Sequence, residues 1–401
     1  MRNQGQGHIR QRGKNGRRRG TIQARSGAFQ VRYSLGRDPV SGKRRRATAT
    51  VKGSRKDAER ELTRLLRTVD TGEHPEPRRM SVADWLNLWL ASTKIEVSPK
   101  THERYAEIVR CYLVPGIGGL ALQRLAPSDI QRAYNSFTRK PSPRTRRHIH
   151  RILRSALARA VEQQALARNP ADALKRLPKV ERKPPATLTV EQSQRLLAAI
   201  KHTTTYWPVM LALATGLRRG ELLALRWRNV DLDRGTIRVV ESLEQTKAGL
   251  RFKSTKSEKG RGVALPSFAI AELRKHKQAQ AEALLALGVR QSGDTLVCGR
   301  IDGQPKQPAS LTHEFTYLVG RIGRDFPRIR FHDLRHSHAT QLLASGVHPK
   351  VVQERLGHST IAVTMDIYSH VTPEMQSEAV AKLNLAFGDH FGDHQPKSTG
   401  A

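Results

Sequence analysis

Three short stretches in the C-terminal half of the 401-residue chain place polar side chains inside otherwise apolar helical patterns. The first is ATGLRRGELLAL, in which Gly216 ends one helix and Arg218 stands at the start of the next. A guanidinium there would lie beside free backbone N–H groups and the positive end of a helix, a setting suited to a phosphate. One arginine among 71 Lys and Arg residues says little by itself, so the other two stretches decide its meaning.

The second stretch, RFHDLRHSHATQLLASG, holds His332 and Arg335 three residues apart, so both lie on one face of a helix. His336 and His338 add further polar positions. Histidines at i and i+4 can bind zinc, which makes a metal site the competing interpretation. The motif HExxH is absent, however, and Asp333 as a third ligand would face elsewhere on the helix. The spacing therefore favours groups directed at a phosphate over a metal site.

The third stretch, ERLGHSTIAVTMDIYSHV, places His358 ten residues before Tyr368. A tyrosine at helical spacing more commonly packs in a core than reacts. The set favours chemistry, because its members occur in this order and each lies in one of the three polar-in-apolar stretches. Its members are Arg218, His332, Arg335, His358 and Tyr368.

These stretches closely resemble the signature boxes of the tyrosine recombinases, the lambda-integrase and Xer-like family, and they occur in the family's order. The resemblance is strong over residues 185 to 385. Residues 79 to 180 resemble the family's core-site-binding domain, and residues 20 to 70 resemble the arm-binding domain of lambda-type integrases. Xer-like resolvases generally lack an arm domain, so the resemblance favours a site-specific integrase.

The resemblance implies a role for each member of the set. Tyr368 matches the nucleophile that forms a 3′-phosphotyrosyl bond, and Arg218 and Arg335 match the two arginines that bind the non-bridging phosphate oxygens. His332 is the candidate base, and His358 would hydrogen-bond the phosphate or orient the tyrosine. Because the covalent intermediate conserves the energy of the phosphodiester, strand transfer is expected to need no ATP, metal or other cofactor.

Two further positions come from the resemblance. Lys256, in FKSTKSEKGRGVALP, is the best match to the family's β-hairpin lysine, which would protonate the departing 5′ oxygen. Lys253 and Lys259 are close competitors, and the hairpin is one residue shorter than the family pattern. Glu221 matches an acidic helical position that would support Arg218 or a neighbouring base.

The helix and strand patterns along the sequence predict a multidomain protein, whose domains must hold these residues in place. Residues 21–76 show two alternating stretches and then a helical one, which indicates a small α+β DNA-binding domain: a β-hairpin, with room for a third strand, followed by a helix. Residues 79–180 lack strand patterns and predict an all-α core-binding domain. Residues 185–387 predict a mainly-α catalytic domain with a small antiparallel β-sheet formed by GTIRVVES, GLRFKSTKS and RGVALP. Residues 1–20 read as a flexible basic arm and residues 388–401 as a tail.

The strands predicted near the N-terminus are strongly basic. A basic sheet of this width fits a DNA groove, whereas a solvated basic surface is the plainer interpretation. The candidate DNA contacts are Arg32, Arg44, Arg45 and Arg46.

The composition points to a polyanionic partner. Lys and Arg number 71 against 35 Asp and Glu, which gives a formal net charge of +36. No stretch approaches the ~20 consecutive apolar residues of a spanning helix, so we expect a protein of the bacterial cytoplasm that lies on DNA and not at a membrane. Cys111 and Cys298 are far apart and form neither a disulfide framework nor a thiolate metal motif.

The partners that the resemblance implies are double-stranded attachment-site DNA, further copies of the chain in a homotetramer, and accessory DNA-bending or directionality factors. Three other classes stay open. A DNA-binding regulator without catalysis would share the positive charge. A metal-dependent nuclease or transposase would need convergent carboxylates, and the acidic residues are scattered. A type IB topoisomerase shares the tyrosine chemistry, but the arm-like region argues against it.

Overall fold

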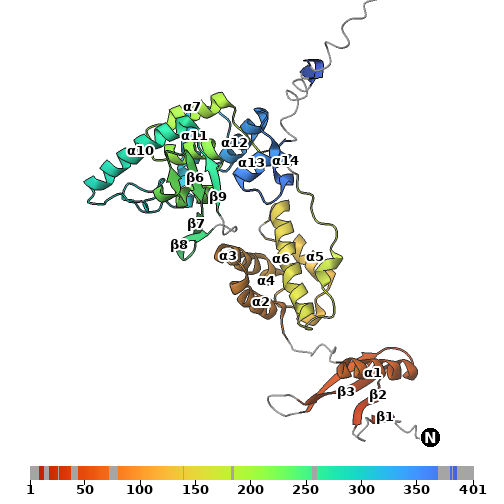
Figure 1. Cartoon of the computed structure of the whole chain (residues 1–401). Coiled ribbons are helices and arrows are strands. Elements are labelled where there is room, and N and C mark those ends of the chain that lie inside the picture. The colour runs from red at the N-terminus through yellow and green to blue at the C-terminus, as the bar shows by residue number, and fades with distance from the viewer. Residues whose placement is uncertain are drawn as a thin grey trace, which may run out of the picture. The chain divides into compact units, whose positions relative to one another are not determined.

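The computed structural model is mainly helical, with small antiparallel sheets (Figure 1). It describes residues 9–12, 18–25, 27–37, 44–71, 80–138, 140–181, 185–254, 260–368, 380–381 and 383–385. The chain divides into two compact units, residues 1–181 and 182–401. Within the described ranges no helix is both long enough and apolar enough to cross a membrane.

The N-terminal part is an antiparallel sheet, with strands in chain order, covered by a helix. The alternation of AFQVRYSL turns Val31 and Tyr33 toward the helix, where Leu62 is buried with them. A capping box begins the helix, because the Ser54 hydroxyl accepts from the Asp57 backbone N–H while the Asp57 carboxylate accepts from the Ser54 N–H. The elements are β1 (Ile9–Arg12), β2 (Arg18–Arg25), β3 (Ala28–Arg37), β4 (Arg44–Val51) and α1 (Arg55–Asp70).

This part contains more strand than the sequence patterns predict. Strand β1 and the first residues of β2 lie inside residues 1–20, where a flexible basic arm is expected. An antiparallel ladder is held by backbone hydrogen bonds, so polar and basic side chains do not prevent a strand from adding at the edge of a sheet.

Residues 80–181 contain helices and short helical turns around one core. Local signals set where the helices begin: Ser81 forms a capping box, and Ser98 and Ser142 each cap a helix with proline at its first position. On the apolar stripe of the last helix, Ile149 and Leu153 are fully buried. The elements are α2 (Val82–Glu96), α3 (Pro99–Ile108), a π-helical turn (Val109–Leu113), α4 (Val114–Ile117), a 3-10 turn (Leu122–Arg124), α5 (Pro127–Asn135), α6 (Pro143–Glu162) and a 3-10 turn (Pro170–Ala173).

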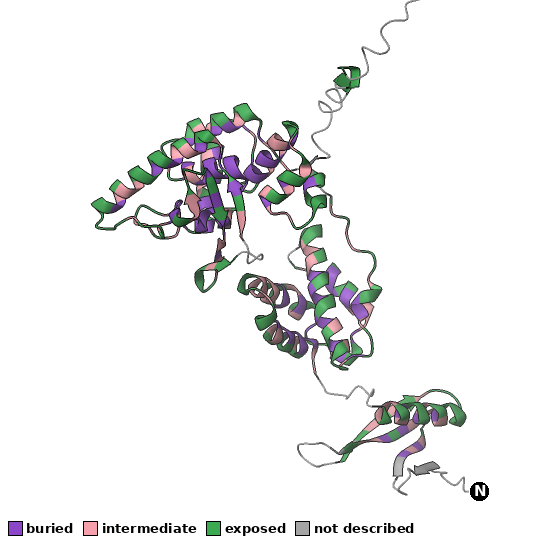
Figure 2. Cartoon of the chain, in the orientation of Figure 1, coloured by how far each residue is buried: buried purple, intermediate pink, exposed green. Residues whose placement is uncertain are grey.

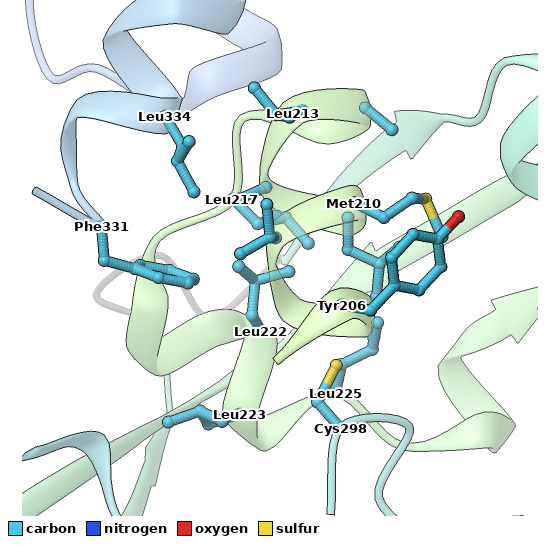
Figure 3. Packing of buried hydrophobic residues seen from close by; sticks show 14 of the residues in the cluster. Tyr206, Met210, Leu213, Leu217, Leu222, Leu223, Leu225, Cys298, Phe331 and Leu334 are labelled. Carbon is cyan, nitrogen blue, oxygen red and sulfur yellow. The ribbon is translucent and has the colours of Figure 1, made fainter. Parts of the chain in front are cut away.

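Residues 185–368 surround a larger core, and buried residues gather in the interior of this unit (Figure 2). Every residue of α8 except Trp207 is buried. Leu222 of α9 and Leu334 of α12 belong to the same buried cluster as the α8 residues (Figure 3). Burying one such side chain contributes about 1.5–3 kcal/mol, so α8 is a firm support for the turn that follows it. The helices are α7 (Val190–Ile200), α8 (Tyr206–Thr215), α9 (Arg219–Ala224), α10 (Ser267–Ala286), α11 (Pro308–Ile322), α12 (Asp333–Ala344), α13 (Pro349–Leu356) and α14 (Ile361–Tyr368).

The strands described between residues 185 and 368 form two separate sheets, where the sequence predicts one. Strand β6 pairs with β5 and β9, while β7 pairs with β8. Strand β7 packs against α9 instead of joining the other sheet, and Gly220 permits this, because a Cβ there would lie 2.7 Å from the Leu243 carbonyl oxygen. The strands are β5 (Val230–Asp231), β6 (Thr236–Val239), β7 (Glu241–Thr246), β8 (Gly249–Ser254) and β9 (Arg261–Ala264).

Candidate active site

The turn between α8 and α9 carries Arg218. Gly216 ends α8 with a φ of 67°, in the left-handed region that favours glycine, and Arg218 is the N-cap residue of α9. The Arg218 backbone N–H donates to Glu221 Oε2 and its Nη1 donates to Glu221 Oε1, both at 2.9 Å. Its Nη2 donates to the Gly357 carbonyl at 2.9 Å. The side chain is 44% exposed, so the guanidinium remains accessible to a ligand.

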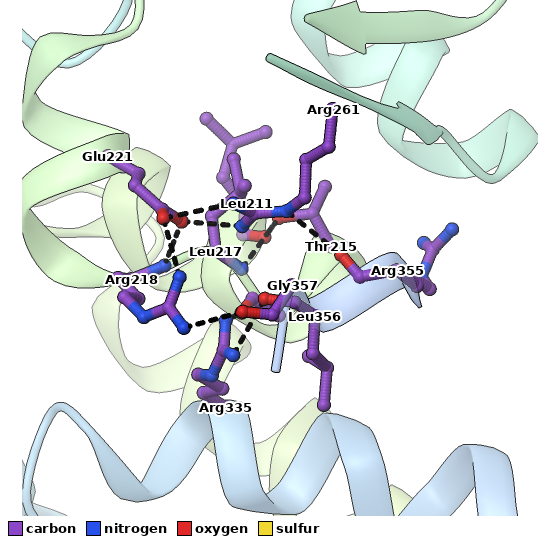
Figure 4. A network of polar contacts seen from close by, with 11 residues as sticks. Leu211, Thr215, Leu217, Arg218, Glu221, Arg261, Arg335, Arg355, Leu356 and Gly357 are labelled. Carbon is purple, nitrogen blue, oxygen red and sulfur yellow. Dashed lines mark hydrogen bonds and ion pairs between the residues drawn. The ribbon is translucent and has the colours of Figure 1, made fainter. Parts of the chain in front are cut away.

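Glu221 is the buried centre of this network (Figure 4). Arg261 of β9 donates from Nη1 to Oε1 at 3.0 Å and from Nη2 to Oε2 at 2.6 Å. Burial alone would raise the pKa of Glu221, but the hydrogen bonds and charge of Arg261, together with the hydrogen bonds from Arg218, outweigh it and lower the pKa. Glu221 is therefore an ionised carboxylate that holds two arginines.

Arg335 of α12 reaches the same place. It is buried and donates from Nη1 to the Gly216 carbonyl and from Nη2 to the Leu356 carbonyl, both at 2.7 Å. Burial, and next the charge of Arg218, lower the pKa of Arg335 to about 9, which leaves it charged at neutral pH. Arg218 and Arg335 thus bind the adjacent carbonyls of Gly357 and Leu356, at a helix C-terminus that favours cations (Figure 4). The structure brings the two predicted arginines together.

His332 and His336 meet at the start of α12, where their rings contact edge to face with centroids 5.2 Å apart. His332 is exposed at its surface, but desolvation by the surrounding protein, followed by the charges of His336 and Arg335, lowers its pKa to about 4. Burial also lowers the pKa of His336, whose Nδ1 is buried without a hydrogen-bond partner among the described residues. Both rings are therefore neutral at pH 7, as a proton acceptor must be.

His358 lies directly after the turn that ends α13. Its Nδ1 is 2.9 Å from Oγ1 of Thr364, a fully buried residue of α14. Burial, and next the charges of Arg335 and Arg218, lower the pKa of His358 to about 4. His358 directly follows Gly357, whose carbonyl accepts from Arg218. Helix α14 ends at Tyr368, whose backbone is described and whose side chain lies outside the described residues.

His338, the remaining polar position of the second stretch, is bound inside the core. Its Nδ1 lies 2.7 Å from the Leu213 carbonyl and donates to it, while its Nε2 accepts from Arg355 Nε at 3.0 Å. Burial, and next the charge of Arg355, lower the pKa of His338 to about 4. As for the competing metal interpretation, the part of the chain that the structure describes contains no group of three or more His, Cys, Asp or Glu able to hold a metal ion.

The predicted lysine falls between two strands. Strand β8 ends at Ser254 and β9 begins at Arg261, so Lys256 and its competitor Lys259 lie outside the described residues. Lys253, the other competitor, is on β8, and its Nζ pairs with Oε2 of the buried Glu244 at 2.9 Å.

Two family models match the chain. The model of the phage integrase family matches residues 186–375, a range that includes every candidate catalytic position from Arg218 to Tyr368. The model of the phage integrase N-terminal SAM-like domain matches residues 81–138. The chain belongs to the phage integrase family of tyrosine recombinases. The family and the enzyme class predicted from the three stretches are thereby confirmed.

Relatives match this tyrosine recombinase over nearly their whole length. A XerC-like tyrosine recombinase of Caldanaerobacter subterraneus is 28% identical over 381 residues, which cover 90% of this chain and 96% of the relative. The ICEBs1 integrase of Bacillus subtilis is 28% identical over 363 residues, covering 90% and 97%.

Solved structures share its fold. The Tn1549 transposon integrase in complex with circular intermediate DNA matches with a TM-score of 0.65 at 19% identity, over 76% of this chain and 99% of that one. Lambda integrase bound to a core site matches with a TM-score of 0.55 at 18% identity, over 86% and 94%. The mainly helical fold with small antiparallel sheets agrees with the class predicted from sequence.

The predicted DNA-contacting arginines of the recombinase lie on β3 and β4. Arg32, Arg44 and Arg46 are exposed, and Arg32 Nη2 donates to Gln30 Oε1 at 3.3 Å. By strand alternation these three side chains occupy the sheet face opposite α1. The side chain of Arg45 lies outside the described residues.

Arg261 is a site residue that sequence reasoning missed. The available signal for Arg261 was its place in the short strand RGVA, two residues before the buried Val263 and hence on the inward face. An arginine at an inward position needs a buried partner. Its partner, Glu221, is 40 residues away, and no local pattern links the two.

Proposed function

We propose that this tyrosine recombinase is an integrase that cuts and rejoins double-stranded DNA at specific attachment sites, and so integrates or excises a mobile element or phage genome. One observation carries the proposal. Arg218 and Arg335 are held at the adjacent carbonyls of Gly357 and Leu356, next to His358 and ahead of the helix that bears Tyr368.

The paired arginines supply what a phosphodiester needs before it can be attacked. The diester is anionic and repels a nucleophile, so its charge must be neutralised and its oxygens must be held in place. A guanidinium has five N–H donors, and the contacts of Arg335 with Gly216 and Leu356 use two of its nitrogens once each. Donors therefore remain on Arg335, and on the exposed Arg218, for the non-bridging oxygens.

Tyr368 is the proposed nucleophile, which forms a 3′-phosphotyrosyl bond as the bond to the 5′ oxygen breaks. A tyrosine hydroxyl has a reference pKa of about 10 and must lose its proton during attack, with neutral His332 as the acceptor. If Thr364 donates to Nδ1 of His358, the His358 proton resides on Nε2 and can be donated to the phosphate. A bound anion would raise the pKa of both histidines, because it offsets the arginines that lower it.

Lys256 is the proposed general acid for the departing 5′ oxygen, and Glu221 is the support that holds Arg218. Lys253 pairs with the buried Glu244, which favours Lys256 over Lys253 as the general acid. If Lys253 moved to the leaving group, the buried Glu244 carboxylate would be left without a partner, which is costly. Lys259 remains a competitor. A 5′ hydroxyl from a second duplex would reverse the step, so exchange would need neither ATP nor a metal.

The assembly follows by analogy. Lambda integrase was solved as a dimer bound to a core site and as a tetramer bound to a Holliday junction. Four copies of this chain would likewise exchange strands between two duplexes, in the bacterial cytoplasm and with DNA-bending or directionality factors. Residues 21–76, together with strands β1 and β2 that reach into residues 1–20, would bind arm-type DNA. Residues 79–180 would bind the core site, and residues 185–387 would carry the chemistry, followed by a tail (388–401).

The decisive experiment has two steps. First, the protein is supplied with DNA that flanks its own gene, and the junctions that form are sequenced to identify the short core sequence. The variant Tyr368→Phe is then tested on a duplex that contains this core. The variant is expected to bind the core with nearly wild-type affinity and to form no protease-resistant DNA adduct, because only the hydroxyl is removed. Tyr317→Phe, at an exposed tyrosine of α11, is the matched control and should still form the adduct. An adduct formed by Tyr368→Phe would sink the assignment.

A further inference from the structure

Arg261 has no part in the chemistry proposed above, yet every nitrogen of its side chain is bound. The side chain is only 17% exposed. Nη1 and Nη2 bind the two oxygens of Glu221, and Nε donates to the Arg355 carbonyl at 3.2 Å. A guanidinium so fully used is built into the site and is not a solvated surface charge.

Glu221 is shared between two arginines with both of its oxygens filled. Oε1 accepts from Nη1 of Arg218 at 2.9 Å and from Nη1 of Arg261 at 3.0 Å. Oε2 accepts from the Arg218 backbone N–H at 2.9 Å and from Arg261 Nη2 at 2.6 Å. Arg218 and Arg261 therefore fix the orientation of the Glu221 carboxylate together. The fixed carboxylate in turn fixes the orientation of the Arg218 guanidinium.

The charges show why a second arginine matters. Glu221 is buried and negative, and on its own it would cancel the positive charge of Arg218. Arg261 neutralises Glu221, so that Arg218 and Arg335 together keep two positive charges for a ligand. Without Arg261 only one net charge would remain, and Arg218 would be drawn toward the buried carboxylate.

We propose that Arg261 is a positioning residue for phosphate binding: by fixing and neutralising Glu221, it keeps the guanidinium of Arg218 available to the scissile phosphate. This inference rests on the integrase function proposed above. The contact with the Arg355 carbonyl serves the same end, because the next two carbonyls, of Leu356 and Gly357, hold Arg335 and Arg218. The Arg261 side chain thus connects β9 to the end of α13, where the carbonyls that bind Arg335 and Arg218 lie.

The test measures single-turnover cleavage of a nicked core-site duplex by the full chain. R261M is expected to slow cleavage of the ordinary phosphodiester about 100-fold, the scale of losing one charge-stabilising donor, while the Kd for the duplex changes less than about threefold. R261K should recover part of the rate, because lysine keeps the charge and loses the planar fork. R238M removes an exposed arginine of β6, the strand paired with β9, and should behave like wild type.

A methylphosphonate at the scissile position separates positioning from general damage. This linkage is uncharged and needs less neutralisation, so the wild-type to R261M rate ratio should fall from about 100 to below about 5. R261K should show the same narrowing, which keeps the test valid if R261M does not fold.

Two results would overturn the inference. If the ratio of wild-type to R261M cleavage rates were the same on the phosphodiester and on the methylphosphonate, Arg261 would act only by stabilising the fold. Full recovery on a 5′-bridging phosphorothiolate, whose leaving group needs no protonation, would assign Arg261 to the general acid instead. If wild-type protein formed no adduct on any duplex, the proposed function itself would fail, a result distinct from both.

Discussion

At the scale of single residues, His338 connects one buried contact to a measurable dependence on pH. It is 5% exposed and lies between the Leu213 carbonyl and Arg355 Nε, and its pKa is lowered from the usual 6.5 to about 4. Between these two values the unfolded chain binds a proton at this position and the folded chain does not. The stability contributed here is therefore complete above pH 6.5 and is lost as the pH falls toward 4.

We predict that His338→Gln weakens this acid sensitivity, since a glutamine amide can donate and accept but does not titrate. Hydrogen exchange of the α8 and α12 amides is measured from pH 7 to pH 4. In the wild type, His338 should account for a loss of unfolding free energy on the order of 3 kcal/mol, the size expected from its pKa shift. His202→Gln, at an exposed histidine, should leave the wild-type curve unchanged. Parallel curves for wild type and His338→Gln would contradict the prediction.

The same residue marks a limit of sequence reasoning. The three stretches, through their resemblance to the tyrosine recombinases, predicted one site for Arg218, Arg335 and His358, and the structure brings Arg218 and Arg335 to adjacent carbonyls. The stretches did not predict that His338 belongs to the core. Its partner, Leu213, is 125 residues away, so the distinction depends on how α12 packs on α8.

At the scale of elements, Gly216 and Gly346 test whether the α8–α9 turn holds the site. Both have a positive φ, 67° and 77°, so alanine is strained at each. A Cβ at Gly346 would meet nothing within 4 Å, whereas one at Gly216 would overlap Leu356 Cδ2 and lie 2.6 Å from His338 Cδ2. Gly346 is therefore a matched control for strain without a clash.

Gly346→Ala is expected to cost about 1–2 kcal/mol of unfolding free energy, the cost of the left-handed conformation alone. Gly216→Ala adds a steric clash worth about 1–3 kcal/mol and displaces the carbonyl that binds Arg335, so cleavage should fall at least about 100-fold. Urea unfolding and single-turnover cleavage measure the two effects. Equal losses in both variants would show that the turn tolerates a side chain.

Element boundaries could be predicted where the signal is local. Ser81, Ser98 and Thr189 each cap the helix that follows with their own side chain, and a cap of this kind depends on a few neighbouring residues that the sequence displays. The division of the strands into two sheets could not be predicted. Pairing of β6 with β9 depends on which strand covers the core and on how closely α9 approaches β7.

At the scale of the whole molecule, the charge of +36 predicts binding that weakens steeply with salt. Composition gave the class of partner, but it could not say which surface meets DNA, because arginine occurs throughout the chain. The proposed contacts Arg32, Arg44 and Arg46 lie on the sheet face opposite α1. Arg64, in contrast, is on α1 and donates to both oxygens of Glu61.

We therefore expect the triple variant R32Q/R44Q/R46Q to bind arm-type DNA with a shallower dependence of log K on log salt. The slope should fall by about 0.9 for each phosphate contact that is lost. R64Q removes the same kind of charge from the opposite side of this part of the chain and should keep the wild-type slope. Fluorescence anisotropy of a labelled duplex between 50 and about 200 mM salt measures both slopes, over a range in which affinity changes strongly. A triple variant with the wild-type slope would mean that this sheet face does not contact DNA, and the search for the arm contact would move to the other basic surfaces.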